Sequence, residues 1–144
     1  MKKVLSGLLI SLILTMFYCG VVLAADTCSV QSSLTLTDYI SELTSGNDTN
    51  KIRINYEVYS NGIASSIGVE SIKIYKDNGS YVTTIWGNTS NGLIRTNSSV
   101  HLGTYDYTVS TDGAYYAEVT VFARIGTNYD SRTVTTSTIT LTLP

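Results

Sequence analysis

Few residues of this chain could carry out catalysis, and the sequence spreads them widely. His101 is the single histidine, and Cys28 is the one cysteine beyond residue 25. Nucleophilic hydrolysis needs a serine or cysteine beside a histidine and an acid, yet the segment G-x-S-x-G that presents such a serine does not occur. Zinc sites draw on several histidine or cysteine ligands, and this chain offers too few. We therefore predict no catalytic residue, no metal site and no cofactor.

The acidic residues bring two further kinds of chemistry to consider, glycoside hydrolysis and calcium binding. Glycosidases use two facing carboxylates, which here would come from Glu57, Glu70, Glu118 and scattered aspartates. Calcium takes oxygens from loops, but aspartates such as Asp77 are common in turns for backbone reasons, and the sequence has no EF-hand loop. We therefore expect that the protein is not an enzyme. Two acidic residues that line one shared cleft would count against this expectation.

Aromatic side chains give the strongest indication of function. Tyr75, Tyr81 and Trp86 lie on the two sides of the polar segment 77–80. Aromatic rings offer a large contact area and lose little rotamer freedom, so exposed rings stack on sugars and anchor protein contacts. We take Trp86, Tyr75 and Tyr81 as candidate ligand-binding residues. The alternative is that these rings form ordinary cross-strand pairs on the outside of a sheet.

Residues 1–25 have the pattern of a secretory signal peptide. The basic pair Lys2-Lys3 precedes an apolar run over residues 4–23, and the small residues Ala24 and Ala25 follow. Cleavage after Ala24 or after Ala25 fits this pattern. A membrane anchor retained through residues 4–23 is the less favoured alternative. We expect a signal-peptide helix and a secreted, extracellular product.

The remaining residues, 26–144, are enough for one domain with its own core. The whole chain has 9 basic and 11 acidic residues, and Lys2 and Lys3 lie in the leader. The exported part is therefore mildly acidic. This argues against binding to nucleic acid, and against membrane contact beyond the signal segment, because both need a basic surface. Cys28 by itself cannot form an internal disulfide.

Residue preferences favour strands throughout this domain. Thr, Tyr, Val and Ile are abundant, and the single proline is the last residue. Apolar and polar residues alternate with a period of two, which predicts strands with one buried and one wet face. Asn78-Gly79 supplies the backbone conformation of a tight hairpin turn. The predicted strands cover residues 30–36, 52–59, 67–75, 81–86, 93–96, 105–109, 115–124 and 131–143.

A few segments are expected to modify this pattern. Thr37-Asp38 can cap a short helical turn that runs through Leu43. His101 follows a turn rich in serine and asparagine, and we expect it to be exposed. Val134 falls out of the alternation of the last strand, which predicts a bulge near Thr135-Thr136. Seven or eight short strands separated by turns predict an all-β fold, an antiparallel β-sandwich.

The segment Thr111-Asp112-Gly113-Ala114-Tyr115-Tyr116-Ala117 resembles the start of the sixth strand of immunoglobulin-like domains. There, a glycine lies two residues before a tyrosine whose hydroxyl bonds back across the corner. Gly113 and Tyr115 match these positions, while Ala117 replaces the second cysteine and Thr111 replaces the usual aspartate. The resemblance, to disulfide-free immunoglobulin-like or fibronectin-like bacterial modules, implies a structural tyrosine corner at Gly113 and Tyr115. An ordinary buried strand tyrosine is the alternative for Tyr115.

Longer segments resemble an uncharacterised family of small secreted proteins of Gram-positive, clostridia-like bacteria. The resemblance covers most of the chain after about Asn50. It implies secretion and an immunoglobulin-like sandwich, but it brings no activity with it. The segments that carry it are Ser71–Lys76, Tyr81–Leu93, Tyr115–Ala123 and Asp130–Ser137.

These observations together predict an exported extracellular binding or interaction module with no catalytic activity. Two kinds of partner stay open. A cell-surface glycan would stack on Trp86 and the nearby tyrosines, which would make the domain a carbohydrate-binding module. Another extracellular protein would pair with an exposed strand edge, as in adhesin-type assembly.

Overall fold

The computed structural model describes residues 35–46 and 50–142, which are strands and the loops between them. The predicted signal peptide 1–25, Cys28 and most of the strand predicted over 30–36 lie outside these residues. No helix occurs in the described ranges. The strands are β1 (Leu36–Ser45), β2 (Lys51–Ala64), β3 (Ser66–Lys76), β4 (Tyr81–Trp86), β5 (Ile94–Arg95), β6 (Ser98–Thr108), β7 (Gly113–Ile125), β8 (Asn128–Thr135) and β9 (Ile139–Leu141).

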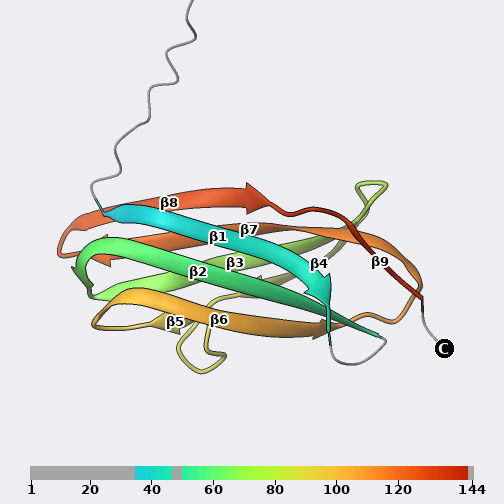
Figure 1. The fold of residues 1–144 in the computed structure, drawn as a ribbon, viewed down its shortest axis with the longest axis horizontal. Coiled ribbons are helices and arrows are strands. Elements are labelled where there is room, and N and C mark those ends of the chain that lie inside the picture. Colours follow the sequence, from blue (N-terminus) through green and yellow to red (C-terminus); the bar gives the residue numbers. More distant parts are fainter. Residues whose placement is uncertain (1–34, 47–49, 143–144) are drawn as a thin grey trace, which may run out of the picture. The chain divides into compact units, whose positions relative to one another are not determined.

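These strands form two antiparallel sheets, so the predicted all-β sandwich is confirmed (Figure 1). Sheet A has the strand order β1-β2-β6. Sheet B has the order β4-β3-β7-β8, with β5 also paired to β3 and β9 also paired to β7. In Figure 1 sheet A lies in front of sheet B. The inner faces of the two sheets enclose one hydrophobic core.

Alternating side chains build this core, as the sequence predicts. In β2, Ile52, Ile54, Tyr56 and Val58 are buried, while the residues that alternate with them are partly exposed. The inward positions of β7 are likewise buried, from Tyr115 through Ala123. Because successive side chains of a strand point to opposite faces, this period of two leaves one face of each sheet for solvent or partners.

The predicted helical turn after Thr37-Asp38 is wrong, since the segment belongs to β1. Asp38 accepts a hydrogen bond from the backbone N–H of Tyr39 at 2.8 Å, but no helix follows. Instead, β1 pairs with β2 without interruption from Asp38 to Ser45. Leu43 is buried while Ile40 is exposed, so pairing with the long strand β2 outweighs the local capping preference.

The predicted exposure of His101 is also wrong. Asn97 has a φ of 53°, so the turn exists, but β6 begins directly after it at Ser98. His101 therefore lies within a strand, opposite the fully buried Val58, and faces the core. Its side chain fits there because the facing backbone at Gly68 carries no Cβ, which would meet the imidazole ring at 2.9 Å.

The last strand is interrupted rather than bulged. The chain leaves sheet B after Thr135 and pairs with β7 again at Ile139. Buried Thr136 holds the break, because its N–H donates to the Ala117 carbonyl at 2.9 Å and its Oγ1 accepts from the Ala117 N–H at 3.0 Å. This interruption divides the last predicted strand into β8 and β9, so the described residues hold nine strands, against the seven or eight predicted.

Candidate functional site

Two of the predicted ligand-binding aromatics meet on the outer face of sheet B. Tyr81 of β4 lies opposite Tyr75 of β3, and Tyr75 lies opposite Tyr116 of β7. The ring centroids of Tyr75 and Tyr81 are 5.9 Å apart in an edge-to-face arrangement, and those of Tyr75 and Tyr116 are 5.2 Å apart and stacked. Three neighbouring strands thus present a continuous line of rings, which we call the tyrosine row.

Hydrogen bonds fix two rings of this row in place, Tyr81 at one end and Tyr75 in the middle. The Tyr81 hydroxyl donates to Thr84 Oγ1 at 3.0 Å, and the Tyr75 hydroxyl donates to Glu118 Oε2 at 3.3 Å. Partial burial among its neighbours, and then the Glu118 carboxylate, raise the pKa of Tyr75. Tyr81 is 61% exposed and so offers much of its ring to a ligand. The tyrosine row is therefore an ordered surface before any partner arrives.

Trp86 lies on the same outer face but stands apart from the tyrosine row. It pairs with Ser71, whereas Tyr81 pairs with Tyr75. The four steps along the strand from Ser71 to Tyr75 span roughly 13 Å. Trp86 is 66% exposed, more than Tyr81. The structure therefore brings Tyr75 and Tyr81 into contact and places Trp86 further along the same face.

Local backbone contacts hold Trp86 at this position. The Asn91 side chain donates to the Trp86 carbonyl at 2.9 Å. The next residue, Gly87, donates its N–H to the Glu70 carbonyl at 2.8 Å. A Cβ at Gly87 would overlap the Val69 carbonyl oxygen, so only glycine allows the chain to approach β3 this closely. The indole ring thus projects from a fixed backbone.

A second aromatic cluster on sheet B was not predicted as a site. Phe122 and Tyr129 stack with ring centroids 5.8 Å apart, and the Arg124 guanidinium carbon lies 4.9 Å from the Tyr129 centroid. The sequence places Phe122 on a wet face and Tyr129 in a loop. In the structure β8 begins earlier, at Asn128, and Phe122 is only 5% exposed. Burial is also the main cause that raises the pKa of Tyr129.

Tyr115 and Gly113, the residues of the predicted tyrosine corner, lie at the start of β7. Tyr115 is 1% exposed, and its hydroxyl donates to the Thr111 carbonyl at 2.6 Å. The hydroxyl is also 2.9 Å from Thr111 Oγ1. Gly113 has a φ of 141°, which favours glycine. Tyr115 thus ties the loop before β7 to the core.

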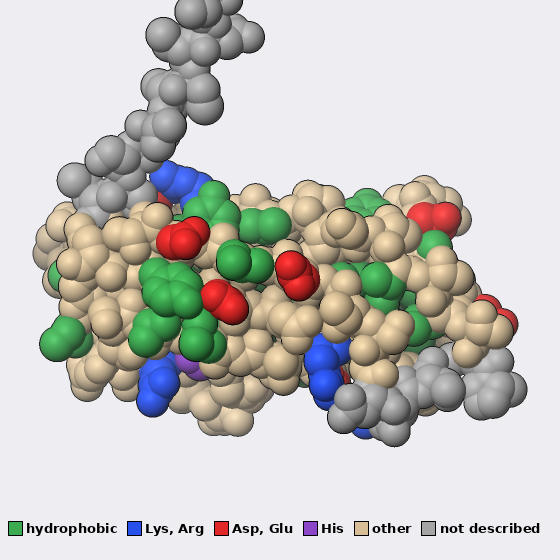
Figure 2. Space-filling model, viewed as in Figure 1, with side chains coloured by type: hydrophobic (Ala, Val, Ile, Leu, Met, Phe, Trp, Pro, Cys, Tyr) green, Lys and Arg blue, Asp and Glu red, His purple; other side chains and the backbone are tan. Residues whose placement is uncertain are grey.

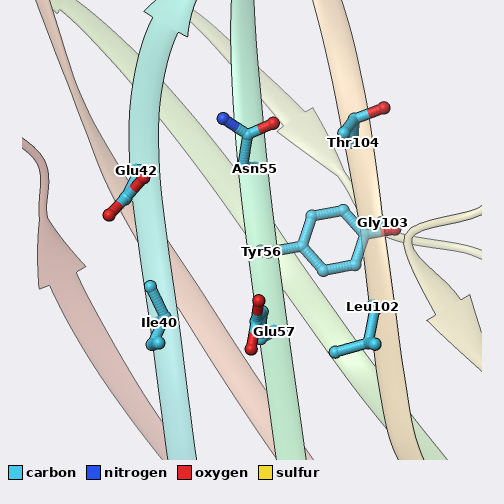
Figure 3. A pocket seen from close by; sticks show the side chains of 8 residues that line it. All are labelled: Ile40, Glu42, Asn55, Tyr56, Glu57, Leu102, Gly103 and Thr104. Atoms are coloured by element: carbon cyan, nitrogen blue, oxygen red, sulfur yellow. The ribbon is translucent and has the colours of Figure 1, made fainter.

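The outer face of sheet A carries a hollow that sequence reasoning missed. Its volume is about 420 Å³, within the range of roughly 300–1,000 Å³ usual for ligand sites. Figure 2 shows this face, where apolar and acidic side chains gather over β1, β2 and β6. The residues that line the hollow are Ile40, Glu42, Asn55, Tyr56, Glu57, Leu102, Gly103 and Thr104 (Figure 3).

This hollow was missed because of the helical turn predicted through Leu43. In that turn, Ile40 and Glu42 would not share a face with the outward side chains of β2. As a strand, β1 sets Ile40 opposite Glu57 and Glu42 opposite Asn55. The residues over Tyr39–Leu43 do not alternate between apolar and polar types, so no local signal in the sequence reveals this arrangement.

One ion pair lies on the same face, beside the hollow. Arg53 of β2 donates from Nε to Asp106 Oδ1 at 2.7 Å and from Nη2 to Oδ2 at 2.8 Å. The two residues face each other in the register of β2 and β6. The hydrogen bonds from Arg53, with its charge, hold the pKa of Asp106 below its usual value.

Beneath this face, His101 and Tyr56 form a buried polar cluster. The Tyr56 hydroxyl donates to the Gly92 carbonyl at 2.9 Å, and His101 Nε2 lies 2.8 Å from the same oxygen. A carbonyl only accepts, so Nε2 carries the imidazole hydrogen and Nδ1 has none. Nδ1 is buried without a hydrogen-bond partner in the described structure. Burial lowers the pKa of His101, and Arg95 adds to this, against the opposing effect of the Gly92 carbonyl.

Over residues 35–46 and 50–142, no three His, Cys, Asp or Glu side chains gather into a group that could hold a metal ion. Within these residues no helix has the length and apolar character needed to cross a membrane.

Comparisons with known proteins identify no family for this chain. No family model matches the sequence, and no curated protein matches it. Among solved structures, the chain is similar to a family 76 glycoside hydrolase from a bovine Bacteroides thetaiotaomicron strain, with 18% identity and a TM-score of 0.43. The match covers 72% of this chain and 20% of that chain, so this chain spans about a fifth of the length of the hydrolase. A likeness at this level assigns neither a family nor a reaction.

Proposed function

We propose that this protein is an exported extracellular module that binds carbohydrate through the outer face of sheet B. One observation carries the proposal. Tyr81, Tyr75 and Tyr116 form a packed row on a solvent face, where a soluble sheet usually has polar side chains. Trp86 extends this aromatic surface along the same face. Flat, ordered rings of this kind stack on the apolar faces of sugars.

The polar residues among these rings suit a sugar ligand as well. Lys73 lies opposite Thr84 in the line between the tyrosine row and Trp86, and Glu118 lies opposite Lys73 on the other side. An ammonium group can donate to the hydroxyls of a sugar, a carboxylate can accept from them, and a hydroxyl can do both. A flat surface with both rings and hydrogen-bonding groups fits a glycan chain that lies along the face.

The module acts by binding alone in this proposal. Glu42 and Glu57 do line one hollow, which is the arrangement that the enzyme alternative requires. However, the general acid of a glycosidase works in a cleft shielded from water, and Glu42 is exposed on an open sheet face. The aromatic surface lies on the other sheet, so a glycan held there would not reach this pair.

We also infer that the sandwich is immunoglobulin-like and that residues 1–25 direct its export. The strand orders β1-β2-β6 and β4-β3-β7-β8 correspond to A-B-E and C′-C-F-G of immunoglobulin-like domains. In this assignment Tyr115 lies in the sixth strand, where its bond to Thr111 matches a tyrosine corner. Sequencing the N-terminus of protein recovered from culture medium tests export, since cleavage after Ala24 or Ala25 is expected.

Glycan binding is tested with an array probed by the wild type, Trp86→Ala and Tyr81→Ala. We expect the wild type to bind a defined set of glycans. Each substitution should weaken that binding by about tenfold, because a lost stacking contact is worth roughly 1–2 kcal/mol. Tyr129→Ala, in the second aromatic cluster of the same sheet, is the matched control and should bind normally. Binding that survives both substitutions, or no binding by the wild type, contradicts the proposal.

A second candidate function is assembly by strand addition at β6. Strand β6 is an edge of sheet A and pairs with β2 in unbroken register from Val100 to Thr108. Long regular edges with few charges accept further strands, and Asp106, the one charged residue of β6, is already paired with Arg53. Light scattering over a range of concentrations tests this candidate. A constant monomer mass would count against self-assembly.

A further inference from the structure

The outer face of sheet A carries a second contact surface, separate from the aromatic face of sheet B. Ile40 of β1 and Leu102 of β6 lie on the two sides of Glu57 in one line across the sheet. These apolar side chains are 46% and 53% exposed. Figure 3 shows Leu102 extending from β6 toward Glu57, so the line is apolar at both ends and acidic in the middle.

Carboxylates dominate the charge around this line. Glu42 lies two residues after Ile40 in β1, opposite Asn55. Asp38 lies two residues before Ile40 in the same strand. The nearest cation in the register of β2 is Arg53, and two hydrogen bonds engage its guanidinium with Asp106. The charge of Arg53 is therefore balanced within the face. Glu42, Glu57 and Asp38 give the hollow a negative potential.

The floor of the hollow is rigid. The Tyr56 ring extends from β2 to β6 and covers Gly103, where a Cβ would meet the ring carbon that bears the hydroxyl at 2.7 Å (Figure 3). The Tyr56 hydroxyl is anchored to the Gly92 carbonyl. A surface ordered in advance loses little entropy when a partner binds. The hollow is therefore suited to a partner whose side chains lie over β2, between the outward side chains of β1 and β6.

We propose that this face binds an extended cationic peptide segment of another extracellular protein. A lysine or arginine of the segment lies between the carboxylates of Glu42 and Glu57. Apolar side chains on either side of it cover Ile40 and Leu102. Charge complementarity selects this occupant, because an anionic glycan, nucleic acid or lipid headgroup would meet three carboxylates. The aliphatic stems of lysine and arginine also cover apolar surface while the charged end stays polar.

The test is a titration of the isotope-labelled protein, followed by amide NMR, with a capped peptide Leu-Lys-Leu-Lys-Leu. The capped peptide Leu-Glu-Leu-Glu-Leu is the charge-reversed control. We expect the lysine peptide to shift the amides of residues 40–42, 55–57 and 102–104, and to bind more weakly as salt is added. The glutamate peptide should leave these amides unchanged. Equal shifts with both peptides, or none with the lysine peptide, overturn the proposal.

Two sets of variants locate the binding. Glu42→Gln combined with Glu57→Gln should weaken binding of the lysine peptide by about 3- to 10-fold, as expected for two exposed charge pairs. Leu102→Ser should weaken it through the apolar contact. Glu118→Gln, on the outer face of sheet B, is the matched control and should bind as the wild type does. Binding that is unchanged in the double variant overturns the proposal.

Other occupants of this face give distinct results in the same experiment. If the amides of residues 40–42 and 102–104 shift with protein concentration in the absence of peptide, the occupant is a second copy of this chain. If neutral oligosaccharides shift them and the lysine peptide does not, the occupant is a glycan. Either result overturns the proposal, and neither depends on whether the tyrosine row binds carbohydrate.

Discussion

At the residue scale, His101 is the group whose protonation is linked most directly to folding. Its Nε2 hydrogen points to the Gly92 carbonyl, so a second proton would go to Nδ1, which is buried and without a partner. Adding that proton places an uncompensated charge in the core. The folded protein therefore holds His101 neutral, and its pKa lies below the usual 6.5.

The first prediction is that acid destabilises the fold through His101. Above pH 6.5 the histidine is neutral in both folded and unfolded chains, so it leaves stability unchanged. Below pH 6.5 the unfolded chain binds a proton that the folded protein does not, and stability falls until the pH reaches the lowered folded pKa. Urea unfolding between pH 7.5 and 5 measures this fall. An NMR titration of the single histidine gives its folded pKa, and a value at or above 6.5 would contradict the account.

The second prediction concerns the buried tyrosine at the start of β7. Tyr115→Phe removes a hydroxyl that donates to the Thr111 carbonyl and lies 2.9 Å from Thr111 Oγ1. We expect a loss of about 0.5–1.5 kcal/mol in the free energy of unfolding, since a partly buried hydrogen bond is removed. Urea unfolding compares it with Tyr116→Phe on the outer face, which should cost less. Equal costs would show that the Tyr115 hydroxyl has no special role.

Single residues also show where sequence reasoning succeeds and where it stops. The burial of Tyr115 follows from strand alternation, which local sequence displays. The burial of His101 depends on where β6 begins and on Gly68 across the sandwich, and no local pattern records either. Likewise, Tyr75 and Tyr81 can be placed together from the hairpin between them, whereas Tyr116 joins them only through the pairing of β3 with β7.

At the element scale, strand pairing overrides the local helix signal in β1. The Asp38 side chain does bond to a neighbouring N–H, but the segment from Asp38 to Ser45 pairs with β2. Sequence patterns alone could not weigh a capping residue against a partner strand that is distant along the chain. The strands β2, β3, β4 and β7 were predicted well, because each has a long alternation or is bounded by a clear turn.

The third prediction tests this assignment of β1. Leu43→Ala should cost about 2–4 kcal/mol, because Leu43 is 6% exposed in the core and its removal leaves a cavity. Ile40→Ala should cost less than about 1 kcal/mol, because Ile40 is 46% exposed on the opposite face. Urea unfolding of the two variants measures both. If Ile40→Ala lost more stability than Leu43→Ala, the register of β1 described above would be wrong.

The fourth prediction concerns Gly87, where the chain that leaves β4 passes close to β3. Gly87→Ala should lose about 3 kcal/mol or more, because the new Cβ overlaps the Val69 carbonyl oxygen and the backbone must move. Gly79→Ala is the matched control, since Gly79 has a φ of 82° and open space around it. There we expect about 1–2 kcal/mol from backbone strain alone. Thermal unfolding that ranks the two variants in the reverse order would contradict this packing.

At the scale of the whole molecule, the sandwich presents two outer faces of different chemistry. Sheet B carries the tyrosine row and Trp86, while sheet A carries the acidic hollow between Ile40 and Leu102. The sandwich and the aromatic residues could be predicted from sequence. The hollow could not, because it needs the register of β1, β2 and β6 at once.

The fifth prediction is that the molecule binds glycans without cleaving them. The carboxylates Glu42 and Glu57 lie on sheet A, away from the aromatic face proposed to hold the sugar. Incubation with each glycan bound on the array should therefore release no smaller product, as chromatography of the mixture can establish. Cleavage that is lost in Glu57→Gln would make the hollow an active site and would contradict a purely binding role.

The central claim is that a glycan binds on the face that carries Trp86 and the tyrosine row. Trp86 is the only tryptophan in the chain, so its fluorescence reports on that face alone. Titration with a glycan that binds on the array should change the emission to saturation and protect the indole, now 66% exposed, from quenching by iodide. If the glycan binds while emission and quenching stay unchanged, the sugar lies elsewhere and the claim fails.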